Sequence, residues 1–185
     1  REFPSSNQGI PEDSFSIAAW IRLHSIDDRS TIITKEILNK RGFEFGVKNG
    51  YVAVHIFKDE ANGSRIENIG TLLEIDRWYH VAMTYNYVGE NNSVIRLYLD
   101  GELDEMLHNV TGPLTKNDAA VRVGHYIWGS NFQRFFNGMI DELYVYNKTL
   151  SKQEIKALMN SGNLANLITG YDSSMGLFRM YPNPT

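Results

Sequence analysis

Apolar and polar residues alternate in several segments of the chain. In residues 15–23 (FSIAAWIRL), Phe15, Ile17 and Ile21 fall on one side and Trp20 falls on the other. Successive side chains of a β-strand point to opposite faces of its sheet, so this pattern predicts a β-strand. Further runs with strand character are 43–47, 51–57, 78–85, 94–101, 102–107, 120–126 and 138–146.

Turn residues separate these runs. Lys48-Asn49-Gly50 joins two of them, and Asn-Gly is a strong hairpin signal because both residues tolerate positive φ. Asp100-Gly101 is a second tight turn. About seven or more short strands with turns between them predict an all-β fold, in which two antiparallel sheets pack as a sandwich.

One segment, 150–160 (LSKQEIKALMN), has helical character instead. Ser151 is suited to the N-cap and Glu154 follows three residues later, which is the pattern of a capping box. Ile155, Leu158 and Met159 form an apolar stripe with helical spacing. We therefore expect one short helix near the C-terminus, packed on the sandwich. Trp20 is expected on the outer sheet face beneath this helix.

Composition and charge narrow the classes of partner. The chain has 185 residues, a formal net charge of −4 and no cysteine. Nucleic acids and anionic membranes attract basic patches, so neither is an expected partner of this interspersed, slightly acidic chain. The apolar runs are too short to predict membrane insertion. The lack of cysteine excludes disulfides, thiol catalysis and cysteine-based metal sites.

Several sequence words together resemble one family. They are 15–23 (FSIAAWIRL), 32–36 (IITKE), 43–56, 77–85 (RWYHVAMTY), 95–103 (IRLYLDGEL), 121–126 (VRVGHY) and 135–159. In this order, across roughly residues 13–160, they resemble the laminin-G-like (concanavalin A-like) jelly-roll modules of bacterial extracellular proteins. The resemblance implies a jelly-roll β-sandwich over 1–165. It leaves function open, because this superfamily includes lectins, carbohydrate-binding modules, adhesion domains, glycan-cleaving enzymes and spacers.

The C-terminal residues 178–185 (FRMYPNPT) carry a second resemblance. They are similar to the opening of the C-terminal sorting domain used for type IX secretion. The alternative is an extended terminal strand with two prolines. The resemblance implies that 166–185 is an extension that begins a sorting domain, and that a longer bacterial parent protein is secreted or attached to the cell surface.

Glycoside hydrolysis is the least favoured function. A retaining glycosidase needs two carboxylates about 5–5.5 Å apart, and hydrolases of this fold carry them on one strand in a Glu-x-Asp-x-x-Glu or Glu-x-Asp-x-Glu string. The nearest string begins Glu102-Leu103-Asp104, but Met106 and Leu107 stand where the last glutamate is needed. We therefore expect a non-catalytic module.

Asp141 is the candidate metal ligand. In 138–146 (GMIDELYVY) it shares its phase with Leu143 and Val145, so its carboxylate is expected on the core side, where it needs donors or a cation. The resemblance implies one structural Ca²⁺ held by this aspartate and by oxygens of the N-terminal segment, such as those of Ser5, Asn7 or Glu12. The alternative is an aspartate that accepts backbone N–H bonds.

Residues 124–136 (GHYIWGSNFQRFF) are the candidate ligand site. This stretch is rich in aromatics and has no acidic residue, which argues against a calcium-bridged lectin site. Aromatic rings stack on sugar C–H faces while amide and guanidinium groups reach hydroxyls. We expect ligand contacts from Tyr126, Trp128, Asn131, Gln133 and Arg134. His55, which shares a strand face with Tyr51 and Phe57, is a separate candidate that would line a concave sheet surface. The alternative is a loop that folds back and buries its aromatics.

These observations predict a secreted binding module for a polysaccharide or glycan, appended to a larger extracellular protein. The competing hypothesis is a protein-binding adhesion or spacer module without a sugar site.

Overall fold

The structure is a computed structural model. It describes residues 2–3, 10–37, 40–58, 63–89, 92–110, 112–115, 117–128, 132–161 and 176–180. Within this part of the chain, no helix is long and apolar enough to cross a membrane.

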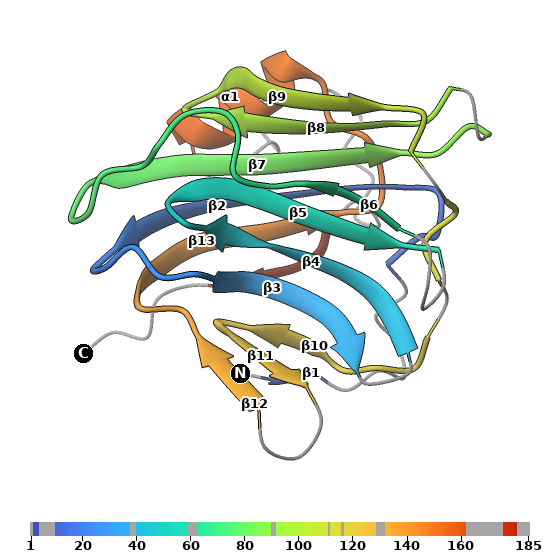
Figure 1. Cartoon of the computed structure of the whole chain (residues 1–185). Helices are drawn as coiled ribbons and strands as arrows, with labels where there is room; N and C mark the ends of the chain where they lie inside the picture. Colours follow the sequence, from blue (N-terminus) through green and yellow to red (C-terminus); the bar gives the residue numbers. More distant parts are fainter. Residues whose placement is uncertain are drawn as a thin grey trace.

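Two six-stranded antiparallel sheets form the sandwich (Figure 1). Sheet A consists, in spatial order, of β1 (Glu2–Phe3), β10 (Val121–Val123), β3 (Ser30–Ile37), β4 (Lys40–Lys48), β5 (Tyr51–Phe57) and β6 (Gly63–Ile66). Sheet B consists of β14 (Gly176–Met180), β13 (Gly138–Tyr146), β2 (Ser14–Leu23), β7 (Trp78–Asn86), β8 (Val94–Leu99) and β9 (Glu102–His108). A separate hairpin pairs β11 (His125–Trp128) with β12 (Phe132–Phe135). The predicted jelly-roll fold is confirmed.

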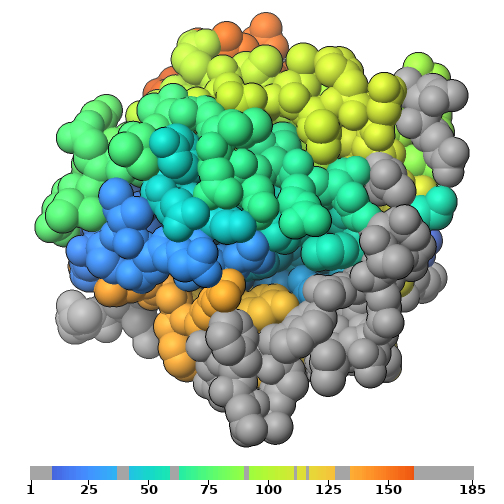
Figure 2. All heavy atoms as spheres, viewed as in Figure 1, coloured from blue at the N-terminus to red at the C-terminus, as the bar shows by residue number. Residues whose placement is uncertain are grey.

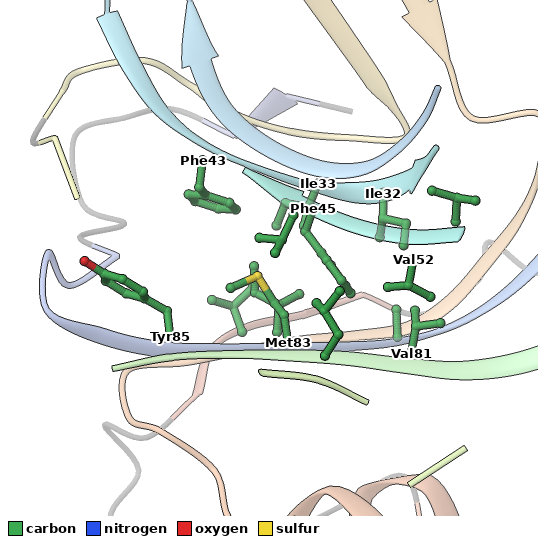
Figure 3. Close-up of a cluster of buried hydrophobic side chains, with 14 of the residues drawn as sticks. Ile32, Ile33, Phe43, Phe45, Val52, Val81, Met83 and Tyr85 are labelled. Atoms are coloured by element: carbon green, nitrogen blue, oxygen red, sulfur yellow. The ribbon is translucent and has the colours of Figure 1, made fainter. Parts of the chain in front are cut away.

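The hydrophobic core lies between the two sheets (Figure 3). Phe43, Phe45 and Val52 of sheet A face Val81 and Met83 of sheet B. Alternation explains the arrangement, because Phe43, Phe45 and Val47 of β4 enter the core while Glu44 and Lys48 alternate with them on the other face. The inner face of β4 is therefore used for packing, and its outer face carries the polar residues Glu44 and Lys48.

The predicted helix is α1 (Lys152–Ser161), and its capping box is present. The Glu154 amide donates to the Ser151 hydroxyl at 3.2 Å, and the Ser151 amide donates to the Glu154 carboxylate at 2.7 Å. Ile155 and Leu158 pack on the outer face of sheet B in a cluster with Ala18, Ala82, Tyr98, Tyr144, Tyr146 and Leu150. Trp20 lies on this outer face as expected, but it is not a member of the cluster under the helix.

A β-bulge in β13 changes the expected direction of Asp141. The register shifts between Asp141 and Tyr144, and Glu142 has a positive φ of 47°. Ile140 pairs with Ile21 of the core, so Asp141 pairs with Trp20 on the outer face of sheet B. The phase argument that placed Asp141 on the core side is wrong, because the extra residue reverses the alternation.

Part of the C-terminal extension belongs to sheet B. β14 pairs with β13 in antiparallel register, from Leu143 opposite Met180 to Tyr146 opposite Gly176. The backbone of 176–180 thus lies at the edge of the sandwich. The sorting sequence and the boundary at residue 165 stay predictions.

Candidate functional site

A cluster of charged groups occupies the outer face of sheet A. Strands β4 and β5 supply Glu44, Lys48 and His55, while Arg29 and Glu67 come from the segments flanking β3 and β6. Five ionisable side chains thus share a small area of one sheet face. Figure 2 shows this side of the molecule, with the strands of sheet A at its centre.

Glu44 is the most deeply buried member, at 5% exposure. The Arg29 guanidinium donates to one carboxylate oxygen at 2.5 Å, and the Thr31 hydroxyl donates to the other at 2.6 Å. A buried carboxylate is tolerated only when such donors satisfy it. Thr31 thus fixes Glu44, and Glu44 holds the Arg29 guanidinium against the sheet, within 3.4 Å of His55 on β5.

His55 and Glu67 form the second half of the cluster. Glu67 accepts from the Lys48 ammonium at 3.0 Å and contacts His55 Nε2 at 2.8 Å. Burial opposes ionisation of Glu67, yet the hydrogen bonds from Lys48 and His55 prevail and lower its pKa to about 2. Burial, and secondly the Arg29 charge, lower the pKa of His55. A neutral imidazole that donates from Nε2 to Glu67 can accept from Arg29 at Nδ1, 3.4 Å away.

A shallow hollow opens among these groups, and we refer to it as the polar hollow. Its lining residues are Arg29, Glu44, Gly46, Val47, Lys48, Ala53, Val54 and His55. Gly46 is required here, because a Cβ would lie 2.4 Å from the Ser30 carbonyl oxygen. The hollow measures about 10 Å³, room for about one water molecule. It therefore fits a protruding hydroxyl and not an enclosed ligand.

The predicted aromatic stretch forms the β11–β12 hairpin. Tyr126 pairs with Arg134, and Trp128 pairs with Phe132 at the hairpin tip. Tyr126 is only 8% exposed, so its ring packs against protein and offers little face for stacking. Gln133 pairs with Ile127. Asn131 lies outside the described residues, and the side chains of Trp128 and Gln133 are likewise not described.

The hairpin and the polar hollow are linked by two consecutive residues. Arg134 of the hairpin forms an ion pair with Asp28 at 3.3 Å. Arg29, which follows Asp28 in the chain, lines the hollow. Contacts of β11 and β12 with β3 also place the hairpin beside this sheet. The structure thus brings His55 and the hairpin, which were predicted independently, to the same side of the molecule.

Other members of the site were missed in the sequence. Strand pairing alone brings four further residues to His55, namely Arg29, Glu44, Lys48 and Glu67. For Glu44 the sequence does hold a signal, because it alternates with Phe43 and Phe45 and so is expected on the outer face of the strand. Phe135 was also missed as a surface residue. It is 62% exposed and stacks on His125 with ring centroids 6.1 Å apart, while the next residue, Phe136, packs against the core.

The carboxylates of the hydrolase-like string have structural partners. Glu102 forms ion pairs with Lys152 and Lys156 of α1. Asp104 accepts from the Thr71 hydroxyl at 2.6 Å and from the Thr71 amide at 3.1 Å. These contacts join β9 to the helix and to the loop between β6 and β7, so both carboxylates have structural partners in the folded chain.

Asp141, the predicted calcium ligand, lies within the described residues, as does Glu12. One carboxylate oxygen of Asp141 accepts a hydrogen bond from the Glu142 amide at 2.7 Å. This contact is of the kind expected under the alternative, an aspartate that accepts backbone N–H bonds. The described residues contain no group of three or more His, Asp or Glu side chains arranged for a metal. Calcium takes six to eight oxygen ligands, so most would come from elsewhere. Ser5 and Asn7 lie outside the described residues.

Comparisons with known proteins agree with the architecture. A family model described as "Concanavalin A-like lectin/glucanases superfamily" matches residues 2–156. The binding domain of botulinum neurotoxin serotype D/C aligns with a TM-score of 0.60 and 20% identity, over 82% of this chain and 37% of that chain. A structure of the neurotoxin DC binding domain in complex with SialylT also aligns with a TM-score of 0.60 and 20% identity, over 82% of this chain and 36% of that chain.

A third similar structure is the heptameric SAP-like pentraxin from Limulus polyphemus, with a TM-score of 0.59 and 15% identity over 80% of this chain and 70% of that chain. The chain spans little more than a third of the length of the neurotoxin domains. No curated protein matches the chain significantly in sequence. At these identities the similar structures establish the fold alone.

Proposed function

Because the chain belongs to the concanavalin A-like lectin/glucanase superfamily, we propose that it is a non-catalytic module that binds a polysaccharide or glycan. The binding surface is the polar hollow together with the neighbouring β11–β12 hairpin. The carbohydrate is held by hydrogen bonds in the hollow and by the aromatic hairpin, with Trp128, Asn131, Gln133 and Arg134 as the hairpin contacts.

The observation that carries this proposal is the mixture of donors and acceptors around the hollow. Arg29 and Lys48 supply cationic donors, and Glu44 and Glu67 supply carboxylate acceptors, each already fixed by a partner. Sugar hydroxyls donate and accept at once, so they match a surface that offers both. Groups held in place beforehand lose little entropy when a ligand binds.

The setting of the module is also part of the proposal. We propose that it is secreted or displayed on the surface of a bacterium as part of a larger extracellular protein. A bound glycan would then raise the effective concentration of substrate or partner for the neighbouring domains. One structural Ca²⁺ held in part by Asp141 completes the proposal, and its remaining ligands would come from the N-terminal segment.

Affinity gel electrophoresis tests the function directly. The native protein is run through gels containing β-glucan, xylan, galactomannan or polygalacturonate, and at least one is expected to slow it. Lys48→Ala and Trp128→Ala should reduce the retardation. Lys58→Ala is the matched control, since it removes an exposed lysine just beyond the other end of β5. Equal retardation of all four proteins would refute this site.

A protein-binding role is the second candidate, and one observation favours it. Exposed apolar side chains gather beside the β4–β5 turn, where Ile26 is 48% and Leu72 is 53% exposed. Both approach Gly50, as their methyl carbons lie 3.4 and 2.7 Å from where its Cβ would be. Apolar patches of this kind mark contact surfaces for proteins. If no polysaccharide retards the chain, this surface becomes the favoured one, and Leu72→Ser is the variant to test.

A further inference from the structure

The outer face of sheet B carries a second group of aromatic and polar residues, beyond the area that α1 covers. Three strands supply it in two cross-strand rows. Met139, Arg22 and Trp78 form the first row, and Asp141, Trp20 and His80 form the second. Neighbours within a row have Cβ atoms about 5 Å apart. We refer to these six residues as the tryptophan platform.

Strand phase places all six side chains on the outside. Ile21, Tyr79 and Val81, which alternate with them, are at most 3% exposed and belong to the core. The helix cluster begins only at the next row, with Ala18, Ala82 and Tyr144. The platform is thus the part of this sheet face that the helix cluster does not include.

Its apolar groups are accessible at the surface. Trp78 is 39% exposed and Met139 is 47% exposed. Trp20 is half-buried and packs edge-to-face on His80, with ring centroids 5.4 Å apart. Large aromatics are normally buried, and here two of the three tryptophans of the chain reach the same sheet face.

Polar groups adjoin these rings. Arg22 pairs with Asp76 at 3.0 Å, and both side chains are partly exposed. Among the platform residues, two buried nitrogen atoms, Arg22 Nε and His80 Nδ1, have no hydrogen-bond partner within the part of the chain that the structure describes. His80 is 98% buried, since its exposure is 2%. A surface with an exposed indole, a half-buried indole and a partly exposed ion pair offers both stacking and hydrogen bonds.

We infer that the tryptophan platform is a second saccharide-binding surface, on the sheet opposite the polar hollow. A pyranose ring stacks on Trp78 and Trp20, and its hydroxyls reach Arg22 and Asp76. The size of the platform favours a sugar over a protein, because stable protein interfaces need about 20–30 residues a side. With one surface on each sheet, the module can bind two glycan segments at once, which raises its avidity for a polymer.

This inference does not depend on the polar hollow, and the experiment separates the two. Retardation in the same polysaccharide gels is measured for Trp78→Ala, Trp78→Phe, Lys48→Ala and the double variant Trp78→Ala/Lys48→Ala. Val88→Ala is the control, an apolar side chain that is 60% exposed in the loop after β7. Each protein's circular dichroism and melting temperature verify that it is folded.

We expect Trp78→Ala to weaken retardation at least several-fold, Trp78→Phe to restore part of it, and the double variant to lose it. Saccharide should also shield Trp78 from quenching by acrylamide in a Trp128→Phe background. Unchanged retardation by Trp78→Ala in both backgrounds would overturn the second surface, even if Lys48→Ala shows that the hollow binds. Self-association that Trp78→Ala abolishes would assign the platform to a second copy of the chain instead.

Discussion

Arg134 of the β11–β12 hairpin forms an ion pair with Asp28 at 3.3 Å, one residue before Arg29 of the polar hollow. Two parts of the candidate site, separated by about a hundred residues in sequence, therefore meet at one dipeptide. Arg29 is held by Glu44, and Asp28 holds the hairpin. The position of the hairpin relative to the hollow depends on this connection.

Asp28→Asn should loosen the hairpin without unfolding the sandwich. The pair is partly exposed, at 31% and 69% for the two side chains, so its loss should cost at most about 1 kcal/mol. Hydrogen exchange followed by mass spectrometry should show faster exchange in 125–135 alone. Glu74→Gln, which breaks the exposed pair with Arg77, is the control. Unchanged exchange in the hairpin would show that the pair does not hold it.

The sequence predicts the fold better than it predicts the site. Alternation in β2, the Asn49-Gly50 turn and the Ser151–Glu154 capping box are local signals, and the structure confirms each of them. The polar hollow depends on pairing between strands that are distant in sequence. His55 was named as a candidate from its strand face and stays a prediction, whereas Arg29 and Glu67 join it only in the folded chain. Asp141 was assigned to the wrong sheet face because no local pattern marks the bulge at Glu142.

Acidification should destabilise the protein through His80. Burial lowers the pKa of His80 from 6.5 to about 4, so the unfolded chain binds a proton at a pH where the folded chain does not. The contribution of neutral His80 to the free energy of unfolding is fully present above pH 6.5. It falls as the pH drops towards 4, by up to about 3 kcal/mol. Urea unfolding at pH 7.5, 5.5 and 4.5 measures this loss.

The variant His80→Gln does not titrate and should show a smaller loss over the same range. Its main-chain amide, which donates to Asp100 at 2.9 Å, remains in place. A wild-type protein as stable at pH 4.5 as at pH 7.5 would contradict the assignment of a neutral, buried His80.

Calcium should raise the melting temperature if Asp141 holds a structural ion, because a ligand that binds only the folded state stabilises it. Thermal melts with added Ca²⁺ and with a chelator should differ for the wild type and coincide for Asp141→Ala. Glu142→Ala, which keeps the aspartate, is the companion variant. Identical wild-type melts in both conditions would leave Asp141 with its backbone-capping role alone.

Glycan cleavage should be absent from this chain. Glu102 forms ion pairs with two lysines, and Asp104 accepts a hydrogen bond from Thr71. Both carboxylates thus have structural partners, and we expect neither to act on a glycosidic bond. Reducing-end assays on the gel polysaccharides should give no product with the wild type or with Glu102→Gln. Release of reducing ends by the wild type that Glu102→Gln or Asp104→Asn abolishes would restore the hydrolase hypothesis.

The most direct measurement is an amide NMR titration of ¹⁵N-labelled protein with an oligosaccharide of the retarding polysaccharide. Binding at the proposed site should shift the amide resonances of residues 44–55 and of the hairpin 125–135, and Lys48→Ala should reduce these shifts. A separate set of shifts around Trp78 is expected from the second surface. Saturable binding that leaves both 44–55 and 125–135 unshifted would contradict the polar hollow as the carbohydrate site.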